Sequence, residues 1–226
     1  ARRLHRATVY GLTLPLVTKA DGSKFGKTES GTVWLDPSKT SPYAFYQFWV
    51  NTSDADAYRF LRYFTFLPVA EISAIEQADA ARSGRRMVQQ VLAQQLTELV
   101  HGRDAVVAAH RIAVALFEGG GAAALTEQDL AQLKQDGLGC TRVGRSRLAE
   151  KTFVQLLVGV GAAASGKQVK DALARGAVTV NDRAVSAAES VQSEAVLAPE
   201  RALFGRFYLV RIGKKQHHLF EVAGDG

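Results

Sequence analysis

Apolar residues recur at helical spacing through residues 40–117. Intervals of three and four predict helices over residues 42–50, 55–66, 73–81, 87–101 and 104–117. Pro42 suits the first turn of a helix, with Thr40 or Ser41 before it as the N-cap. The pattern predicts an all-helical bundle of about four members, and we assign its aromatic stripe to the core: Tyr43, Phe45, Tyr46, Phe48 and Trp49.

Capping residues mark the ends of these helices. Ser53 or Asp54 is expected to cap the second helix, and Asp104 the last one. His101 followed by Gly102 is an ordinary helix end, because histidine suits the negative end of the helix dipole and glycine suits the C-cap. We therefore give His101 no catalytic role.

The pattern changes after residue 117. Residues 118–124 contain three glycines and three alanines and predict a linker. Thr126 with Asp129 three residues later predicts the capped start of a short helix. Three arginines then follow among glycine and serine, and we expect them to form a flexible basic hinge: Arg142, Arg145 and Arg147.

The pattern of residues 151–226 predicts an α+β domain. Apolar spacing predicts one helix over residues 153–157 and a second one that Ser165 caps, with Val169, Ala172 and Leu173 facing inward. Asn181-Asp182 suits a tight turn between two strands. The predicted strands are residues 177–180, 183–185, 207–212 and 216–220.

The start of the chain is basic and then extended. Residues 12–14 and 16–18 read as short extended segments that Pro15 interrupts. We expect them to be the last strand material of a preceding domain.

Composition narrows the class of protein. The chain has 226 residues, 47% of them hydrophobic, which is enough for one or two cores. Its single cysteine, Cys140, excludes a disulfide framework and fits a reducing cytosol. No apolar run is long enough to span a membrane, and the five histidines do not recur at metal-ligand spacing, so we expect neither a membrane partner nor a protein-bound metal.

Charge is unevenly distributed along the chain. The net charge of +6 divides into +4 for residues 1–50, −1 for residues 51–150 and +3 for residues 151–226. A basic balance favours a polyanionic partner. The neutral middle suits a structural helical body between two anion-facing parts.

The run Lys24-Phe25-Gly26-Lys27-Thr28 is the candidate chemical site. Lysine ammoniums and exposed backbone N–H groups in a glycine loop are suited to a polyphosphate. A Walker A loop is excluded, because Gly22 and Gly26 enclose three residues where that motif needs four. Taken alone, the pentapeptide is more typical of a solvated turn.

The continuation of the run favours a function. Lys24-Phe25-Gly26-Lys27-Thr28 resembles the Lys-Met-Ser-Lys-Ser signature of class I aminoacyl-tRNA synthetases. Val33-Trp34-Leu35-Asp36-Pro37 and the aromatic run after Thr40 resemble the segment that comes after this signature in the bacterial tyrosyl-tRNA synthetases. The resemblance extends to Leu203-Phe204-Gly205-Arg206-Phe207. That family carries a Rossmann domain with a His-Ile-Gly-His-type signature ahead of this loop, and we expect this chain to be the C-terminal portion, which begins with the end of that domain just before the loop.

The resemblance implies a reaction and its partners. A tyrosine–tRNA ligase joins tyrosine to its tRNA through a tyrosyl-adenylate made from ATP, with Mg²⁺ as the counter-ion of ATP. It implies catalytic roles for Lys24 and Lys27, ATP binding by residues 24–28, a cytoplasmic location and a homodimer of the full-length protein. Two alternatives stay open: a non-enzymatic RNA-binding fragment, and the related tryptophanyl-tRNA synthetase.

The end of the chain resembles a known RNA-binding module. Residues 165–185 are similar to the small domain first named for ribosomal protein S-four, although Asp182 replaces the usual glycine and Gly166 the usual basic residue. The resemblance implies RNA contacts from Lys167, Gln168, Lys170, Arg175 and Arg183. On composition alone, these cations would be a solvated helix face.

These predictions divide the chain into four parts. We expect the edge of a catalytic domain with the signature loop (residues 1–39), a helical anticodon-binding bundle (40–117), a linker with a short helix (118–150) and an S-four-like RNA-binding domain (151–226). The fold class is therefore mainly α with a C-terminal α+β module.

Overall fold

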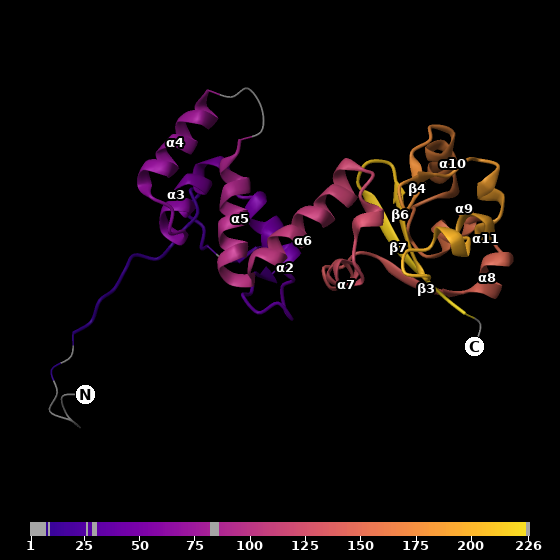
Figure 1. The fold of residues 1–226 in the computed structure, drawn as a ribbon, viewed down its shortest axis with the longest axis horizontal. Coiled ribbons are helices and arrows are strands. Elements are labelled where there is room, and N and C mark those ends of the chain that lie inside the picture. The colour runs from indigo at the N-terminus through magenta and orange to yellow at the C-terminus, as the bar shows by residue number, and fades with distance from the viewer. Residues whose placement is uncertain (1–7, 9, 26, 29–30, 82–85, 225–226) are drawn as a thin grey trace.

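The chain is elongated, with a helical part beside a mixed α/β part (Figure 1). The computed structural model describes residues 8, 10–25, 27–28, 31–81 and 86–224. The predicted order, a helical part followed by an α+β part, is confirmed. None of the described helices is both long and apolar enough to cross a membrane.

The bundle has five helices, one in each of the five predicted ranges, although we expected a bundle of about four members. They are α2 (Pro42–Val50), α3 (Asp54–Phe64), α4 (Val69–Ala80), α5 (Val88–His101) and α6 (Arg103–Ala113). The Ser41 and Ser53 side chains accept hydrogen bonds from the amides of Ala44 and Asp56, so both are N-caps as predicted.

Three predicted boundaries in the bundle are wrong. Helix α4 starts at Val69, four residues early, because Pro68 supplies a suitable N-cap backbone. Gly102 holds the N-cap position of α6, so Asp104 lies in its first turn and is not the cap. The regular helix ends at Ala113 and continues as a π-helix over Val114–Glu118.

The aromatic stripe of α2 forms the core of the bundle, as predicted. Tyr43, Phe45, Tyr46 and Trp49 are buried, and Phe48 is half-buried against them. Phe60 of α3 and Leu92 of α5 complete the same core. Burying a large aromatic side chain stabilises a fold by roughly 1.5–3 kcal/mol, so this cluster dominates the packing of the bundle.

The glycine-rich segment after the bundle, predicted as a linker, is an ordered joint. Gly119 and Gly120 have φ angles of 77° and 85°, a region that favours glycine. A Cβ on Gly121 would lie 2.9 Å from the backbone nitrogen of Ala115. The Ala122 amide donates a 2.6 Å hydrogen bond to the Asp182 carboxylate. These glycines therefore permit tight turns and a close backbone contact, and they do not make the segment flexible.

The short helix after the joint is confirmed. Helix α7 (Glu127–Gln135) begins with a capping box in which Thr126 and Asp129 satisfy each other's backbone amides. The Asp129 carboxylate also pairs with Arg111 at 2.7 Å, which fixes α7 to α6.

The predicted basic hinge is wrong. Strand β3 (Cys140–Gly144) carries Arg142 and pairs in parallel with the far end of the chain, and α8 (Arg145–Ala149) carries the other two arginines. Only Val143 and Leu148 are buried in these two elements. Two buried residues are too few to predict a strand from the local sequence. Strand β3 forms because it pairs with β7, which is distant in sequence.

The C-terminal domain has the two predicted helices and the predicted hairpins, and a short helix, α11, that was not predicted. Its helices are α9 (Phe153–Gly159), α10 (Gly166–Ala174) and α11 (Ser193–Val196). Its further strands are β4 (Val178–Val180), β5 (Arg183–Ala184), β6 (Phe207–Ile212) and β7 (Gln216–Ala223). The sheet order is β3-β7-β6-β4-β5, with every pair antiparallel except β3–β7. Asn181 and Asp182, at φ 46° and 66°, form the predicted tight turn.

The two faces of this sheet belong to different cores. Phe207, Leu209 and Leu219 pack with the bundle and α7. Tyr208 and Phe220, on the opposite face, pack with α9 and α10. Because side chains alternate between the faces of a strand, β6 and β7 join the helical part to the terminal domain.

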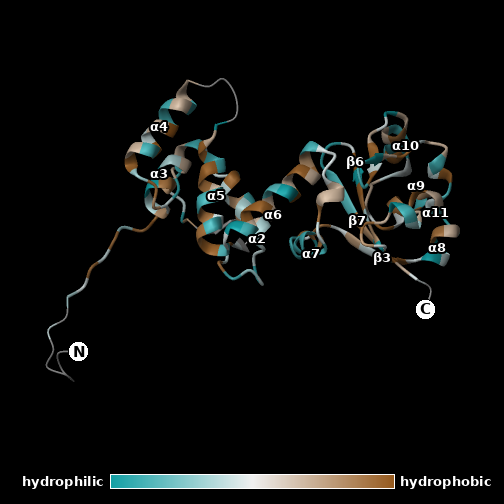
Figure 2. Ribbon diagram, in the orientation of Figure 1, coloured by the Kyte–Doolittle hydropathy of each residue, from teal (hydrophilic) through white to brown (hydrophobic). Residues whose placement is uncertain are grey.

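The segment before the bundle, predicted as extended strand material of a preceding domain, forms no strand among residues 10–16. It runs away from the body of the molecule, and Figure 2 shows hydrophobic colour along it. Tyr10, Leu12, Leu14 and Leu16 are 94%, 91%, 83% and 69% exposed. A strand needs hydrogen bonds from a neighbour, and this segment has none among the described residues.

Candidate functional site

The first half of the signature run lies on a small hairpin. The Lys19 amide donates to the Ser23 carbonyl at 2.8 Å, and the Phe25 amide donates to the Val17 carbonyl at 3.3 Å. Thr18 lies opposite Lys24 in an antiparallel bridge. We call residues 17–25 the loop stem. Lys24 is exposed and makes no ion pair with another described residue.

Its tight turn is closed by a side chain. The Asp21 carboxylate accepts hydrogen bonds from the amide and the hydroxyl of Ser23 at 2.9 and 2.6 Å. These bonds lower the pKa of Asp21. Gly22 has a φ of 80°, which explains the glycine at this point of the turn.

The second half of the run is a two-residue ladder. Strand β1 (Lys27–Thr28) pairs in antiparallel register with β2 (Gly31–Thr32). Gly26 lies outside the described residues, as do the side chains of Lys27 and Thr28. The backbone of the run is therefore two short hairpins in succession.

Phe25 attaches the loop stem to the bundle. Its ring lies 4.7 Å from Phe60, 5.4 Å from Phe64, 5.5 Å from Trp49 and 5.9 Å from Phe48, measured between centroids. Edge-to-face and offset contacts of this kind add about 0.5–1.5 kcal/mol per pair beyond burial.

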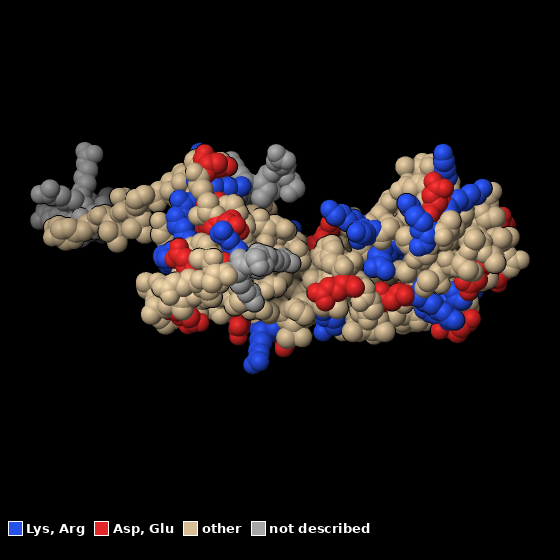
Figure 3. Space-filling model, turned by 90° about the horizontal axis from the view of Figure 1, so that it is seen from above, with Lys and Arg blue, Asp and Glu red and all other residues tan. Residues whose placement is uncertain are grey.

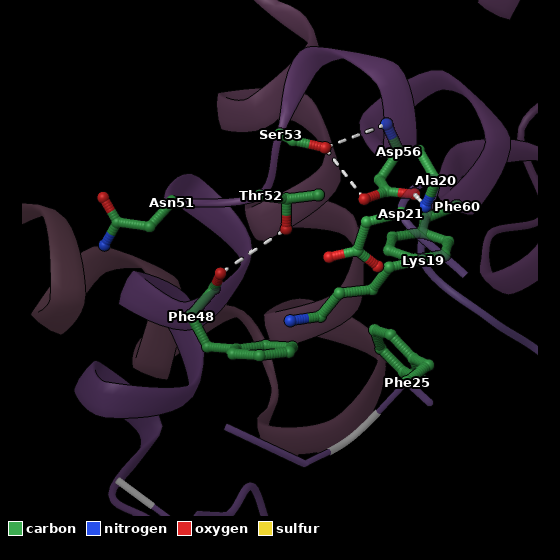
Figure 4. A pocket seen from close by; sticks show the side chains of 10 residues that line it. All are labelled: Lys19, Ala20, Asp21, Phe25, Phe48, Asn51, Thr52, Ser53, Asp56 and Phe60. Carbon is green, nitrogen blue, oxygen red and sulfur yellow. Dashed lines mark hydrogen bonds between the residues drawn. The ribbon is translucent and has the colours of Figure 1, made fainter. Parts of the chain in front are cut away.

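A cavity of about 480 Å³ lies between the loop stem and the bundle. Figure 4 shows the side chains of Lys19 and Asp21 directed into it from the loop, with Phe25 and Phe48 on one side and Asp56 on the other. Phe25 of the signature run lines this cavity together with Lys19, Ala20 and Asp21 of the loop stem.

Asp56 and Arg59 of α3 bind the backbone of the loop stem. The buried Asp56 carboxylate accepts from the Ala20 amide at 2.7 Å, from the Ser53 hydroxyl at 2.8 Å and from Arg59 at 3.0 Å. The same guanidinium nitrogen of Arg59 donates to the Thr18 carbonyl. Sequence reasoning missed both residues, because an acid and a base three positions apart on a helix are typical of a surface ion pair.

The predicted RNA-contact residues of α10 are exposed. Lys167, Lys170 and Arg175 stand off the buried face that Val169 and Leu173 form. The prediction that these cations avoid the apolar face of the helix is confirmed. Figure 3 shows basic side chains standing out along the C-terminal domain, with acidic ones between some of them.

Gln168 brings a second basic element close to α10. Its side-chain amide donates to Gln216 at 3.4 Å, at the start of β7, while its oxygen accepts from the Ala164 amide at 3.1 Å. The turn before Gln216 carries Lys214 and Lys215, both exposed. Two adjacent lysines in a predicted hairpin turn could have indicated from the sequence that the basic surface of α10 extends to this turn.

Arg183 stands apart from those residues. It lies on β5 at the sheet edge and pairs with Val180, at the end of β4 that turns through Asn181-Asp182. That turn contacts the joint at Ala122. The structure therefore places Arg183 at the bundle-facing end of the domain.

Family comparisons divide the chain in two. Residues 1–118 match the model described as tRNA synthetases class I (W and Y). Residues 132–220 match the model described as the tyrosine–tRNA ligase SYY-like C-terminal domain. The boundary between the two matches falls near the ordered joint.

Individual relatives extend over nearly the whole chain. The tyrosine–tRNA ligase of Aeromonas hydrophila is 54% identical over 99% of this chain and 50% of its own length. That of Aliivibrio salmonicida is 52% identical over 97% of this chain and 49% of its own length. A solved C-terminally truncated mitochondrial tyrosyl-tRNA synthetase of Aspergillus nidulans is 41% identical over 40% of this chain and 25% of its own, at a TM-score of 0.37. The chain thus spans about half the length of the curated relatives it matches.

Proposed function

The chain belongs to the class I tRNA synthetase family of the tryptophan and tyrosine enzymes, and from that premise we propose that it is the C-terminal portion of a tyrosine–tRNA ligase. The observation that carries the proposal is the tyrosine-type C-terminal domain over residues 132–220, in a chain that also holds a signature loop. The tryptophanyl alternative lacks support from that domain.

The activity we propose has two steps. The carboxylate of tyrosine attacks the α-phosphate of ATP, which gives tyrosyl-adenylate and pyrophosphate, and the terminal ribose of the tRNA then takes the tyrosyl group. Displacement at phosphorus requires mainly positioning and charge stabilisation from the protein. Mg²⁺ would accompany ATP as its counter-ion.

Lys24 and Lys27 are the catalytic residues in this proposal. Each is a compact charge on a long stem, suited to the negative charge that develops on the leaving pyrophosphate. The side chain of Lys24, exposed and without an ion-pair partner among the described residues, supports this role, since a cation already bound to a carboxylate would be less available to a phosphate. Residues 24–28 would contact ATP, with Lys27 as the principal ligand.

The remaining parts would hold tRNA. We assign anticodon binding to the bundle and further RNA contact to Lys167, Gln168, Lys170, Arg175 and Arg183. Exposure of the α10 cations and the adjoining Lys214 and Lys215 supports this assignment. A homodimer in the cytoplasm is the assembly that the family resemblance implies.

The exposed segment before the bundle supports the idea of a longer protein. Four large apolar side chains within residues 10–16 face solvent. Contiguous exposed apolar residues mark surfaces that a partner covers. In this proposal the Rossmann domain of the same polypeptide covers them.

Amino-acid-dependent exchange of pyrophosphate into ATP tests the function. The full-length protein is assayed with tyrosine, tryptophan or phenylalanine as the only amino acid. We expect exchange with tyrosine alone. Exchange that depends on tryptophan, or none with a folded protein that binds ATP, would contradict the proposal.

A further inference from the structure

Helix α3 differs from an ordinary bundle helix in what its charged residues contact. Asp56 is 4% exposed, and its two carboxylate oxygens accept from three donors. One of these donors is the Ala20 amide, which belongs to the loop stem and is 36 residues away in sequence. A buried carboxylate is tolerated only when such donors satisfy it, so this geometry ties α3 to the loop.

Arg59 makes the second tie to the same strand of the hairpin. It donates both to Asp56 and to the Thr18 carbonyl. Thr18 is the residue that lies opposite Lys24 in the bridge. Asp56 and Arg59 thus bind the strand that pairs with Lys24 in the hairpin.

The aromatic contact fixes the other strand of the hairpin. Phe25 follows Lys24 directly, and its ring packs on Phe60, which is the residue after Arg59. Both strands of the loop stem are therefore bound by one turn of α3, spanning Asp56 to Phe60. Lys24 lies between these attachments, and its side chain is exposed.

The same helix supplies a comparison that separates loop positioning from helix stability. Arg62, three residues after Arg59, pairs with Glu76 of α4 at 2.7 Å, and both side chains are exposed. Like Asp56–Arg59, this ion pair joins an arginine of α3 to a carboxylate, but it bridges α3 to α4 and among the described residues has no bond to the loop stem. Exposed pairs of this kind contribute about 0–1 kcal/mol.

We propose that Asp56 and Arg59 are positioning residues for adenylate formation, which hold the loop stem so that Lys24 and the following Lys27 meet the phosphates of ATP. The inference rests on the proposed ligase function. Neither residue touches ATP: each acts through the backbone of Thr18 and Ala20. Misplacement of a reacting group by about 1 Å can cost on the order of 100-fold in rate, so the loss of either tie should slow the first chemical step.

The kinetic test uses Asp56→Asn and Arg59→Gln in the full-length ligase, with Arg62→Gln and Glu76→Gln as matched controls. Pre-steady-state formation of tyrosyl-adenylate is measured at varied ATP and varied tyrosine. We expect the rate constant for adenylate formation to fall about 10- to 100-fold in the first pair, with the KM for tyrosine unchanged, and no change in the controls. Arg59→Lys keeps the positive charge but lacks the planar guanidinium, so its rate constant should lie between those of Arg59→Gln and the wild type.

A second readout reports on the loop directly. Hydrogen exchange of the Ala20 amide is compared in the same four variants, with amides of α5 as the internal reference. We expect Asp56→Asn to speed exchange at Ala20 about 10-fold, the effect of weakening a bond to a charged acceptor. The reference amides and both controls should stay unchanged.

The outcomes are distinguishable. If wild-type protein forms no adenylate with any amino acid, the ligase function is wrong, and the proposed positioning role falls with it. If wild type forms adenylate and Asp56→Asn and Arg59→Gln match it in rate, the positioning role alone is overturned. A loss of rate equal in all four variants, or one accompanied by faster exchange throughout α5, would also overturn it, since that would be general destabilisation.

Discussion

Lysine is used in two different settings in the two halves of this molecule. Near the bundle, Lys24 lies on the loop stem, whose backbone is bound by Asp56 and Arg59 and whose Phe25 packs in an aromatic cluster. On the terminal domain, Lys167 and Lys170 stand on the outer face of a helix, with no described carboxylate bound to either. The difference indicates that the first region is built for position and the second for a positive field.

The two regions also divide the hydrophobic core. The bundle core contains Phe60 and one face of β6 and β7, and the terminal core contains Phe153 and the other face. Strands β6 and β7 contribute residues to both cores. The difference between the two regions can therefore be tested by substituting buried core residues or by substituting exposed cations.

Truncating one buried aromatic in each core has the largest expected effect. Phe60 and Phe153 are 1% and 0% exposed. We expect Phe60→Ala and Phe153→Ala each to lower the free energy of unfolding by about 3–5 kcal/mol. Urea unfolding followed by circular dichroism measures both changes. Only Phe60→Ala should also raise hydrogen exchange in residues 17–25, because Phe25 packs on Phe60. Equal disturbance of the loop by Phe153→Ala would break the comparison.

Removing the principal signature lysine comes next. In the full-length enzyme, Lys27→Ala should slow adenylate formation about 100- to 1,000-fold, the scale of losing one preorganised charge-stabilising group. Tyrosine binding should change little, because the negative charge that Lys27 stabilises develops on the phosphates of ATP and not on tyrosine. Rapid-quench measurement of adenylate, with equilibrium binding of tyrosine as the control, tests this. An unchanged rate constant would remove Lys27 from the chemistry.

Removing one exposed cation of the terminal domain should have a smaller effect. Lys170→Ala should weaken tRNA binding and reduce the slope of log affinity against log salt by about 1, as expected for one lost phosphate contact. Arg206→Ala, which removes a cation that is ion-paired with Glu127 and lies outside α10, serves as the matched control. An equal loss in the two variants would mean that net charge, not the α10 surface, governs binding.

Mild acid should give the smallest effect. Burial lowers the pKa of His218, which is 6% exposed and bonds Thr141 at 2.9 Å. Burial, aided by Arg211, also lowers the pKa of His217. Below the ordinary value of 6.5 the unfolded chain binds protons that the folded chain does not. Stability should therefore be constant above pH 6.5 and fall as the pH drops below it. His218→Gln should flatten this dependence in a denaturant titration, and an unchanged pH dependence would contradict the role of His218.

Local patterns predicted the elements and missed the contacts between them. Ser41, Ser53, Thr126 and Ser165 are caps whose signal lies within three residues, and all four were predictable. Strand β3 was missed because its order comes from β7, about 80 residues later. The order of the joint was not predicted, because glycine is common both in flexible segments and where backbones approach closely.

The candidate site divides in the same way. The lysines of the signature run and of α10 were identified by their residue type and spacing. Asp56 and Arg59 were not, because only the fold brings α3 to Thr18 and Ala20. The aromatic contacts of Phe25 were missed for the same reason, because only the fold brings its ring to Phe48, Trp49, Phe60 and Phe64.

Binding of tRNA to this chain tests the central claim most directly. Affinity for tyrosine tRNA and for a non-cognate tRNA would be measured across a salt series, with a cooperative thermal melt to establish folding. We expect tighter binding of tyrosine tRNA, with affinity that falls as salt rises because phosphate contacts release counterions. No binding by a folded sample, or equal affinity for both tRNAs, would contradict the claim that these two regions hold and read tRNA.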